Sequence, residues 1–190
     1  MTQLLPTRTV DGVQLPAPGD WQLDPSHTTV EFVGRHLMVS KVRGRFPEVE
    51  GVIHVADDPA DSSVEVTIQT ASVDSRDANR DAHLRSEDLF HVEQYPTITF
   101  RSTKVEGEGS EWKVTGDLTI KDVTRPVVLD VELTGVVSDP WGGRRAGFSA
   151  HTDVNREDWG ITWNLALEAG GVVVSKKIRI ELEIEAILAS

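Results

Sequence analysis

The chain has 190 residues and a mass of 20.9 kDa, which fits one domain large enough to bury a core or enclose a cavity. It contains no cysteine, which excludes disulfides, thiolate metal sites and cysteine nucleophiles. A formal net charge of −12 disfavours binding to nucleic acid and tight electrostatic docking to an anionic membrane, because like charges repel.

The chain shows no apolar run near the ~20 residues of a membrane helix. Its start, "MTQLLPTRTVDGVQLPAPGDW", has neither a long apolar segment nor an early basic cluster, so we expect no signal peptide and a cytoplasmic location. Residues 1–19 hold three prolines and little periodicity. They predict an N-terminal extended arm with at most one short strand, "TVDGVQL". A single domain is expected over residues 20–190.

From Trp21 onward, apolar and polar residues alternate with the period of a strand that has one wet face. About eight segments carry this pattern: residues 27–34, 49–56, 63–70, 97–103, 112–121, 126–137, 145–154 and 176–188. Such a sheet must hide its apolar face and its edges, and closure into a barrel does both. The pattern therefore predicts an all-β protein built as an antiparallel eight-stranded barrel, with a two-sheet sandwich as the alternative.

The alternation also predicts which side chains face the interior. The apolar positions Val30, Phe32, Val66, Ile68, Phe100, Leu118, Ile120, Leu129, Val131 and Phe148 are expected inside, and Glu65, Asp130, Glu181 and Glu183 outside. Several interior positions are small, namely Gly51, Gly116, Ala146 and Ala150. A barrel of about eight strands can either fill its interior with side chains or hold one small ligand. Small inward residues leave space for a ligand, although glycines also serve the bends of a barrel.

The alternation stops in the segment "RDAHLRSEDLFHVEQYPTITF", residues 80–100. Asn79 is a plausible helix cap, and Ser86 followed by two acids is a plausible second helix start. The segment is therefore expected to form a short helical insert of one or two helices. Its apolar side chains, Leu84, Leu89 and Phe90, would lie over one barrel end as a lid.

Two loops carry residues that suggest catalysis. Asp24, Ser26 and His27 lie close together in "DPSHTTVEF", and His83 lies in the helical insert. A hydrolase using His27 or His83 is therefore one alternative. A turn entering a strand explains the first group more simply, since no G-x-S-x-G turn occurs. His36 is expected to be a buried structural histidine.

No metal site is predicted. His83 and Glu87 are four residues apart, with Asp81 and His91 nearby, but the chain contains no H-x-H, H-E-x-x-H or Asp-rich calcium loop. The run "DVNREDWGITW" reads as a tight turn, with Trp159 and Trp163 placed to cover the barrel floor or mouth.

Four blocks, in order from about Trp21 to Ala186, resemble the YceI-like family. The first, "LDPSHTTVEFVGRHLMVSKVRGRF", is similar to the family's opening signature. The second, "RDAHLRSEDLFHVEQYPTITFRST", resembles its Arg-Asp-x-x-Leu and Tyr-Pro-x-Ile-x-Phe block. The others, "VTGDLTIKDVTRPVVLDVELTG" and "VNREDWGITW", resemble its Gly-x-Leu-Thr-Ile and Asn-Arg-x-Asp-aromatic-Gly blocks.

The resemblance implies a lipocalin-like barrel whose apolar pore binds a polyisoprenoid or similar amphiphilic lipid without catalysis. Transport, storage or stress protection would follow, with a polyisoprenoid or quinone-like lipid bound, no cofactor, and transient membrane contact for ligand exchange. The predicted ligand-binding residues are Val30, Phe32, Val66, Ile68, Leu84, Leu89, Phe90, Ile98, Phe100, Leu118, Ile120, Leu129, Val131, Phe148, Trp159 and Trp163.

Loop arginines are the candidates to contact an anionic or quinone-like head group, since a guanidinium recognises such groups well. They are Arg35, Arg80, Arg85 and Arg156, each of which could instead form a surface ion pair. A non-lipid partner-binding module, using a sheet edge or the N-terminal arm, is the remaining alternative. Homodimer formation stays open.

Overall fold

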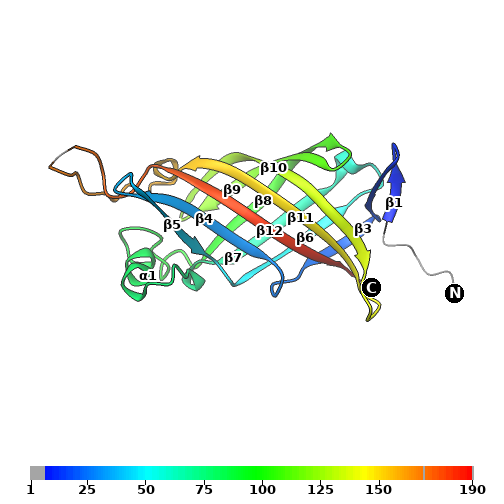
Figure 1. Ribbon diagram of the computed structural model, residues 1–190, viewed down its shortest axis with the longest axis horizontal. Helices are drawn as coiled ribbons and strands as arrows, with labels where there is room; N and C mark the ends of the chain where they lie inside the picture. The colour runs from blue at the N-terminus through cyan, green and yellow to red at the C-terminus, as the bar shows by residue number, and fades with distance from the viewer. Residues whose placement is uncertain (1–6, 169, 190) are drawn as a thin grey trace.

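The computed structural model describes residues 7–168 and 170–189, which form an antiparallel β-barrel with one short α-helix (Figure 1). The strands are β1 (Thr7–Val10), β2 (Val13–Pro16), β3 (Gly19–Leu23), β4 (Thr29–His36), β5 (Ser40–Arg45), β6 (Val49–Val55), β7 (Ser63–Gln69), β8 (Thr97–Glu108), β9 (Glu111–Ile120), β10 (Val123–Ser138), β11 (Arg144–Asn155) and β12 (Lys177–Leu188). The helices are η1 (Pro59–Asp61), η2 (Thr70–Ser72), α1 (Ala78–Arg85) and η3 (Arg156–Trp159). None of the described helices is long and apolar enough to cross a membrane.

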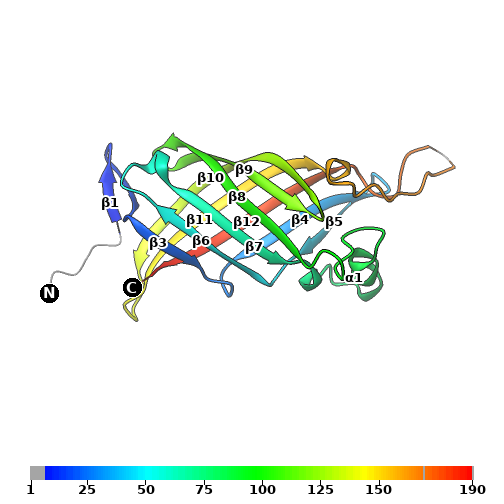
Figure 2. The same cartoon turned by 180° about the vertical axis from the view of Figure 1, so that it is seen from behind.

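The barrel is closed. The ten-stranded sheet runs in the order β11-β10-β9-β8-β7-β6-β3-β12-β4-β5, and β11 also pairs with β12. Because β12 pairs with β3 on one edge and with β11 on the other, β3 and β6 to β12 make a ring of eight strands, visible from both sides in Figures 1 and 2. The predicted eight-stranded antiparallel barrel with a short helical insert is confirmed. Full closure leaves the ring without a free edge.

Strands β3 and β4 follow one another along the same edge of β12. β3 pairs with residues 186–188 of β12 and β4 with residues 179–183, and the turn at residues 24–28 lies between them. β5 pairs with β4, and β6 pairs with β3. The segment β3–β4 therefore lies beside the segment β5–β6, and together they form this wall. Asp74, in the segment after η2, pairs with Arg45 of β5 through an isolated antiparallel bridge.

The sequence pattern missed β3 and β5 for physical reasons. β3 has five residues, too few for a clear period. β5 has the sequence SKVRGR, in which Lys41, Arg43 and Arg45 alternate with Val42 and Gly44. Gly44 gives no apolar signal because the ring of Phe32 fills its inner face; a Cβ at Gly44 would lie 2.2 Å from Phe32 Cζ.

Residues 7–16 form a β-hairpin where the sequence predicted an extended arm with at most one short strand. The predicted strand "TVDGVQL" contains the turn itself, since Asp11 and Gly12 have φ of 50° and 84°. Asp-Gly is a preferred pair for a turn of this kind. The hairpin lies at the barrel end opposite α1 (Figure 1). Its Leu15 is buried, and Arg8 donates to the carbonyls of residues 56 and 57.

The helical insert has one helix, and its cap differs from the prediction. Asp77, not Asn79, caps α1, with its carboxylate accepting from the Arg80 amide at 2.8 Å. The second helix predicted at Ser86 does not form, and residues 86–95 make turns. Ser86 ends α1 instead, since its amide and its hydroxyl both donate to the His83 carbonyl.

Candidate functional site

The barrel encloses an apolar cavity of about 570 Å³. Its wall comes from the inner faces of the strands, and the helical insert and the loop after η3 lie at one end. Fourteen of the sixteen predicted ligand-binding residues line it: Val30, Phe32, Val66, Ile68, Leu84, Leu89, Phe90, Ile98, Phe100, Leu118, Ile120, Leu129, Trp159 and Trp163. Nine of them lie on strands, where alternation turns every second side chain inward. The other five come from the helical insert and from η3 with the loop after it: Leu84, Leu89, Phe90, Trp159 and Trp163.

Val131 and Phe148 do not line this cavity. They line a second space of about 120 Å³, which the N-terminal hairpin residues Leu15 and Pro16 also line. Both residues face inward as predicted, but they lie farther along their strands. Phe100 lines both spaces, and its ring packs against Gly116, where a Cβ would lie 2.4 Å from Phe100 Cζ. Phe100 therefore stands at the boundary between the two spaces.

Aromatic contacts hold the helical insert against the barrel. The ring of Phe90 lies 5.5 Å from that of Phe46 and 6.2 Å from that of Phe32, measured between centroids. The ring of His83 meets Trp163 edge to face at 4.4 Å, joining the insert to the loop after η3. Edge-to-face contacts of this kind are favourable for aromatic pairs, so the insert is packed over the cavity end.

Trp159 forms part of the cavity wall from η3. It is buried, and its indole N–H donates to the Leu118 carbonyl at 2.9 Å. The ring is thus removed from water and its N–H has an acceptor, as a buried tryptophan requires.

Three of the four predicted head-group arginines line the cavity: Arg35, Arg80 and Arg156. Arg85 does not. Its guanidinium donates to the carbonyls of Ala71 and Val73, at 2.8 and 2.7 Å, so it fastens the insert to the segment after β7.

Arg156 is buried, and within the described part of the chain its guanidinium donates to backbone carbonyls. It contacts those of Ser175 at 2.9 Å, Ile161 at 2.7 Å, Trp163 at 2.9 Å and Val174 at 3.4 Å. Burial lowers the pKa of its guanidinium from its ordinary value, opposed by the nearby charge of Glu157. Arg156 therefore pins both sides of the loop between η3 and β12 while it brings a positive charge to the cavity wall.

Arg80 is held by Ser75, whose hydroxyl and carbonyl accept from it at 2.8 and 2.9 Å. Among the described residues, the arginines that form ion pairs are Arg43, Arg45, Arg101, Arg145 and Arg179. The three arginines of the cavity are absent from that set. Within the described residues, these three guanidinium groups therefore line the cavity without an ion-pair partner.

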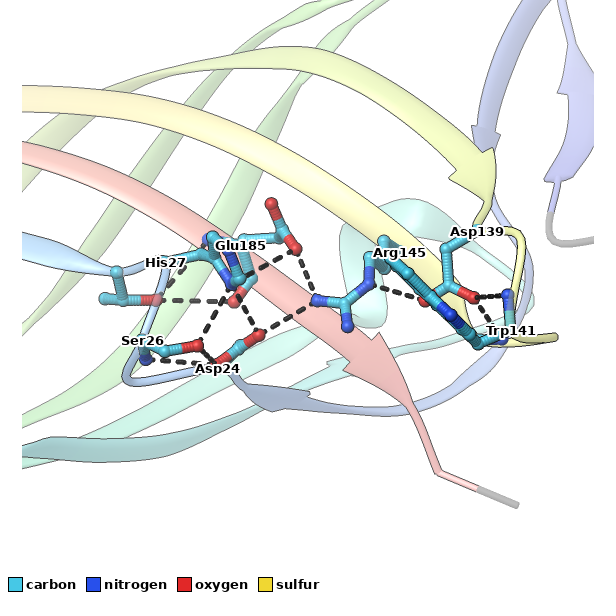
Figure 3. Close-up of polar contacts among 9 residues, drawn as sticks. Asp24, Ser26, His27, Asp139, Trp141, Arg145 and Glu185 are labelled. Carbon is cyan, nitrogen blue, oxygen red and sulfur yellow. Dashed lines mark hydrogen bonds and ion pairs between the residues drawn. The ribbon is translucent and has the colours of Figure 1, made fainter.

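The Asp24, Ser26 and His27 group lies on the outside of the barrel, and its geometry does not match a catalytic triad (Figure 3). Ser26 Oγ and Asp24 Oδ2 both contact the same atom, His27 Nδ1, at 3.0 and 2.9 Å. In a triad, the base uses one ring nitrogen for the nucleophile and the other for the acid. Ser26 Oγ also donates to Asp24 Oδ1 at 2.6 Å, which fixes the turn between β3 and β4.

Asp24, His27 and Glu185 bring potential metal-ligand atoms within 4.8 Å of one another. Arg145 already occupies this position, donating to Asp24 at 2.9 Å and to Glu185 and Asp139 (Figure 3). A divalent cation would face the guanidinium at close range. The cluster is thus a salt-bridge network that ties the turn after β3 to β11 and β12.

This network should make stability depend on acid pH. Hydrogen bonds from Ser26 and His27 hold the pKa of Asp24 well below its ordinary value. The ionised Asp24 carboxylate therefore contributes its full stabilisation above the pKa of about 3.9 that it has in the unfolded chain. This stabilisation is lost as the pH falls through the lower pKa of the folded protein. We expect Asp24→Asn to lower the free energy of unfolding by about 2 kcal/mol at pH 7, and the difference from wild type to shrink below about pH 4.

Urea denaturation between pH 2 and pH 8 measures this effect. Glu50→Gln is the matched control, because Glu50 is exposed and belongs to none of the ion pairs found in the described part of the chain. A difference for Asp24→Asn that stays constant down to pH 2 would contradict the role of its ionised form.

The other histidines do not gather into a site. His36 is exposed at the end of β4, so the prediction of a buried structural histidine is wrong. His83 Nε2 contacts Asp88 at 3.1 Å, whereas the Asp81 carboxylate is buried and accepts from Ser75. Among the described residues, the group of three or more potential ligand atoms within 4.8 Å of one another is Asp24, His27 and Glu185, so His83, Asp81 and Asp88 do not form such a group.

Comparison with known proteins identifies the family. The YceI-like domain model matches residues 21–186. Protein YceI of Escherichia coli O157:H7 is 42% identical over 149 residues, which cover 77% of this chain and 78% of that protein. The chain belongs to the YceI-like family.

Solved structures share the YceI-like barrel. The YceI protein of Campylobacter jejuni superimposes with a TM-score of 0.71 at 33% identity, covering 82% of this chain and 90% of that one. A polyisoprenoid binding domain from Saccharophagus degradans, implicated in plant cell wall breakdown, gives a TM-score of 0.68 at 15% identity, covering 89% and 98%. The second similarity concerns the fold alone.

The cavity of this YceI-like chain has lining residues that the sequence analysis did not select. Ile178, Ile180, Leu182 and Ile184 lie on the inward face of β12 and could have been found from the alternation of that strand. Phe46, Val173 and Val174 also line it, but they lie outside the twelve strands. Periodicity gives no signal for residues of this second kind.

Proposed function

We propose that this YceI-like protein binds a polyisoprenoid or similar amphiphilic lipid without catalysing its conversion. The hydrocarbon chain occupies the apolar cavity, and the head group lies at the end formed by Arg35, Arg80 and Arg156. The observation that carries the proposal is one cavity of about 570 Å³ that combines an apolar wall with arginines outside the ion-pair network. Its volume lies within the range of roughly 300–1,000 Å³ found for ligand pockets.

Selectivity comes mainly from the head group and the cavity shape. Transfer of a hydrocarbon chain from water gains ~0.8 kcal/mol per buried CH₂. In a cell, the competing solvent is a membrane that is already apolar, so this gain largely cancels. A guanidinium at the cavity wall contacts a phosphate or carbonyl head group and leaves an alkane unrecognised.

Two further observations support a binding role. The neighbour from Saccharophagus degradans is described as a polyisoprenoid binding domain, and its barrel is similar to this one. The helical insert covers the cavity end through Leu84, Leu89 and Phe90, as expected for a protein that stores or carries a lipid. A cytoplasmic location and stress protection stay predictions from the sequence.

Mass spectrometry of an organic extract of the purified protein tests this function. We expect one class of prenyl lipid or quinone-like lipid at near-stoichiometric amount, and uptake of a fluorescent isoprenoid by delipidated protein. His27→Ala and His83→Ala serve as controls and should change isoprenoid affinity by only a few-fold, because the apolar wall does the binding. A protein that carries no lipid and takes up no isoprenoid would contradict the proposal.

A further inference from the structure

The turn between β4 and β5 exposes three consecutive apolar side chains. Leu37, Met38 and Val39 are 39%, 54% and 82% exposed. The turn projects at the barrel end that carries α1 and the loop after η3, where Leu165 is 56% exposed (Figure 1). We call residues 37–39 the apolar tip. Grouped apolar side chains left in water on a soluble protein indicate an interaction surface.

The backbone of the apolar tip adopts a conformation that leucine and methionine do not favour. Leu37 and Met38 both have positive φ, 51° and 59°. Such positions favour Asn and Gly, and the chain uses Asp11-Gly12 in the corresponding turn of the N-terminal hairpin. A leucine and a methionine in this conformation are strained and also exposed. Turn formation therefore does not explain these residues.

The apolar tip is fixed at the end of the cavity that carries the helical insert and the loop after η3, which we call the cavity mouth. The Leu37 amide donates to the Val173 carbonyl at 2.9 Å, and His36 forms a bridge with Val174. His36, Val173 and Val174 all line the cavity. A partner surface that binds the apolar tip would therefore also lie against the cavity mouth, where a lipid would enter.

The segment that carries the apolar tip has a charge opposite to that of the whole protein. Residues 34–41 contain Arg35 and Lys41 and no acid, in a chain of net charge −12. Neither cation belongs to an ion pair within residues 7–168 and 170–189. An anionic membrane repels most of this protein, so these two cations favour approach with the tip first.

We propose that the apolar tip inserts into an anionic phospholipid bilayer and places the cavity mouth against the membrane surface. Leu37, Met38 and Val39 enter the interface, while Arg35 and Lys41 contact lipid phosphates. This inference rests on the proposed function, because docking at the mouth gives a hydrocarbon chain a path that avoids water. The membrane is then the direct partner in lipid exchange.

Flotation with vesicles that contain no isoprenoid tests the proposal, so docking is measured separately from cargo binding. The variant Leu37→Asn/Met38→Gly replaces the apolar pair with the sequence that the turn prefers. We expect it to bind vesicles of 30% phosphatidylglycerol and 70% phosphatidylcholine about tenfold more weakly, since two apolar side chains are lost from the interface. Its thermal stability should equal or exceed that of wild type.

Two variants sharpen the outcome. Trp141→Ser removes an 88% exposed tryptophan from the β10–β11 turn at the opposite end of the barrel, and it should bind vesicles like wild type (Figure 1). Lys41→Ser should weaken binding to anionic vesicles and leave binding to pure phosphatidylcholine unchanged. Unchanged flotation of Leu37→Asn/Met38→Gly, or a loss with Trp141→Ser instead, would overturn the proposal. Normal isoprenoid uptake from detergent by the tip variant would show that cargo binding is intact.

Discussion

Replacing Phe100 with aspartate is expected to abolish isoprenoid binding by a barrel that still folds. Phe100 lies at the boundary between the large cavity and the smaller space below the N-terminal hairpin. A carboxylate there would be surrounded by apolar side chains and would lack a partner, which costs several kcal/mol when a hydrocarbon chain excludes the water around it. We expect affinity to fall at least about a hundredfold, given that roughly 1.4 kcal/mol corresponds to a factor of ten.

Titration with a fluorescent isoprenoid measures the loss, and circular dichroism confirms that the barrel is folded. Thr99→Asp is the matched control, because it adds the same charge one residue away on the exposed face of β8. Phe100→Leu keeps the position apolar and should retain binding. A folded Phe100→Asp protein with wild-type affinity would place the ligand elsewhere.

Replacing Arg156 with alanine is expected to lower the free energy of unfolding by about 3 kcal/mol. Its guanidinium donates to four backbone carbonyls on the two sides of the loop between η3 and β12. Each buried acceptor that loses its donor costs about 1–3 kcal/mol, and water entering from the cavity would recover part of this. The destabilisation should appear first as faster proteolysis within residues 160–176.

Chemical denaturation gives the magnitude, and Arg125→Ala provides the comparison. Arg125 is exposed and makes a single bond of 3.3 Å to the Asp158 carbonyl, so its loss should cost less than about 0.5 kcal/mol. Arg156→Lys should fall between wild type and alanine, because one ammonium group cannot reach all four carbonyls. Equal stability of Arg156→Ala and wild type would show that the loop is held by other contacts.

The same residue should also affect ligand selectivity. Arg156 brings a positive charge to the cavity and forms no ion pair with a described carboxylate, so Arg156→Lys should keep affinity for an anionic prenyl lipid better than alanine does. An uncharged prenyl chain should bind all three proteins alike. This pattern separates a head-group contact from the structural role, which both ligands would report equally.

The strand pattern predicted the barrel because alternation directly records which side chains meet water. Val66, Ile68 and Phe100 face inward, while Glu65 is exposed. The acidic and aliphatic residues of β12 alternate in the same way, so the residues of the inner wall could be predicted from the sequence. The pattern could not show that Val131 and Phe148 lie in a separate space, since a period of two gives the face of a strand and not the height along the barrel.

Loops and caps depended on contacts that no local pattern contains. Asp77 and Asn79 are both residues suited to capping a helix, and in the structure α1 begins after Asp77, whose carboxylate accepts from the Arg80 amide. The sequence pattern did not indicate β5, because the Phe32 ring fills the inner face at Gly44, where the pattern would need an apolar side chain.

The chain by itself thus determined the strand faces, the apolar interior and the family to which the protein belongs, because these depend on residue type and spacing along a strand. The tertiary structure alone decided which arginines reach the cavity. It directed Arg85 to two backbone carbonyls, buried Arg156 in the cavity wall, and carried the apolar tip to the mouth. The contacts of Arg85 and Arg156 join loop residues 5 to 19 positions apart, and the contact that holds the apolar tip joins Leu37 to Val173. None of these contacts follows the period of a strand, so the alternation of the sequence does not indicate them.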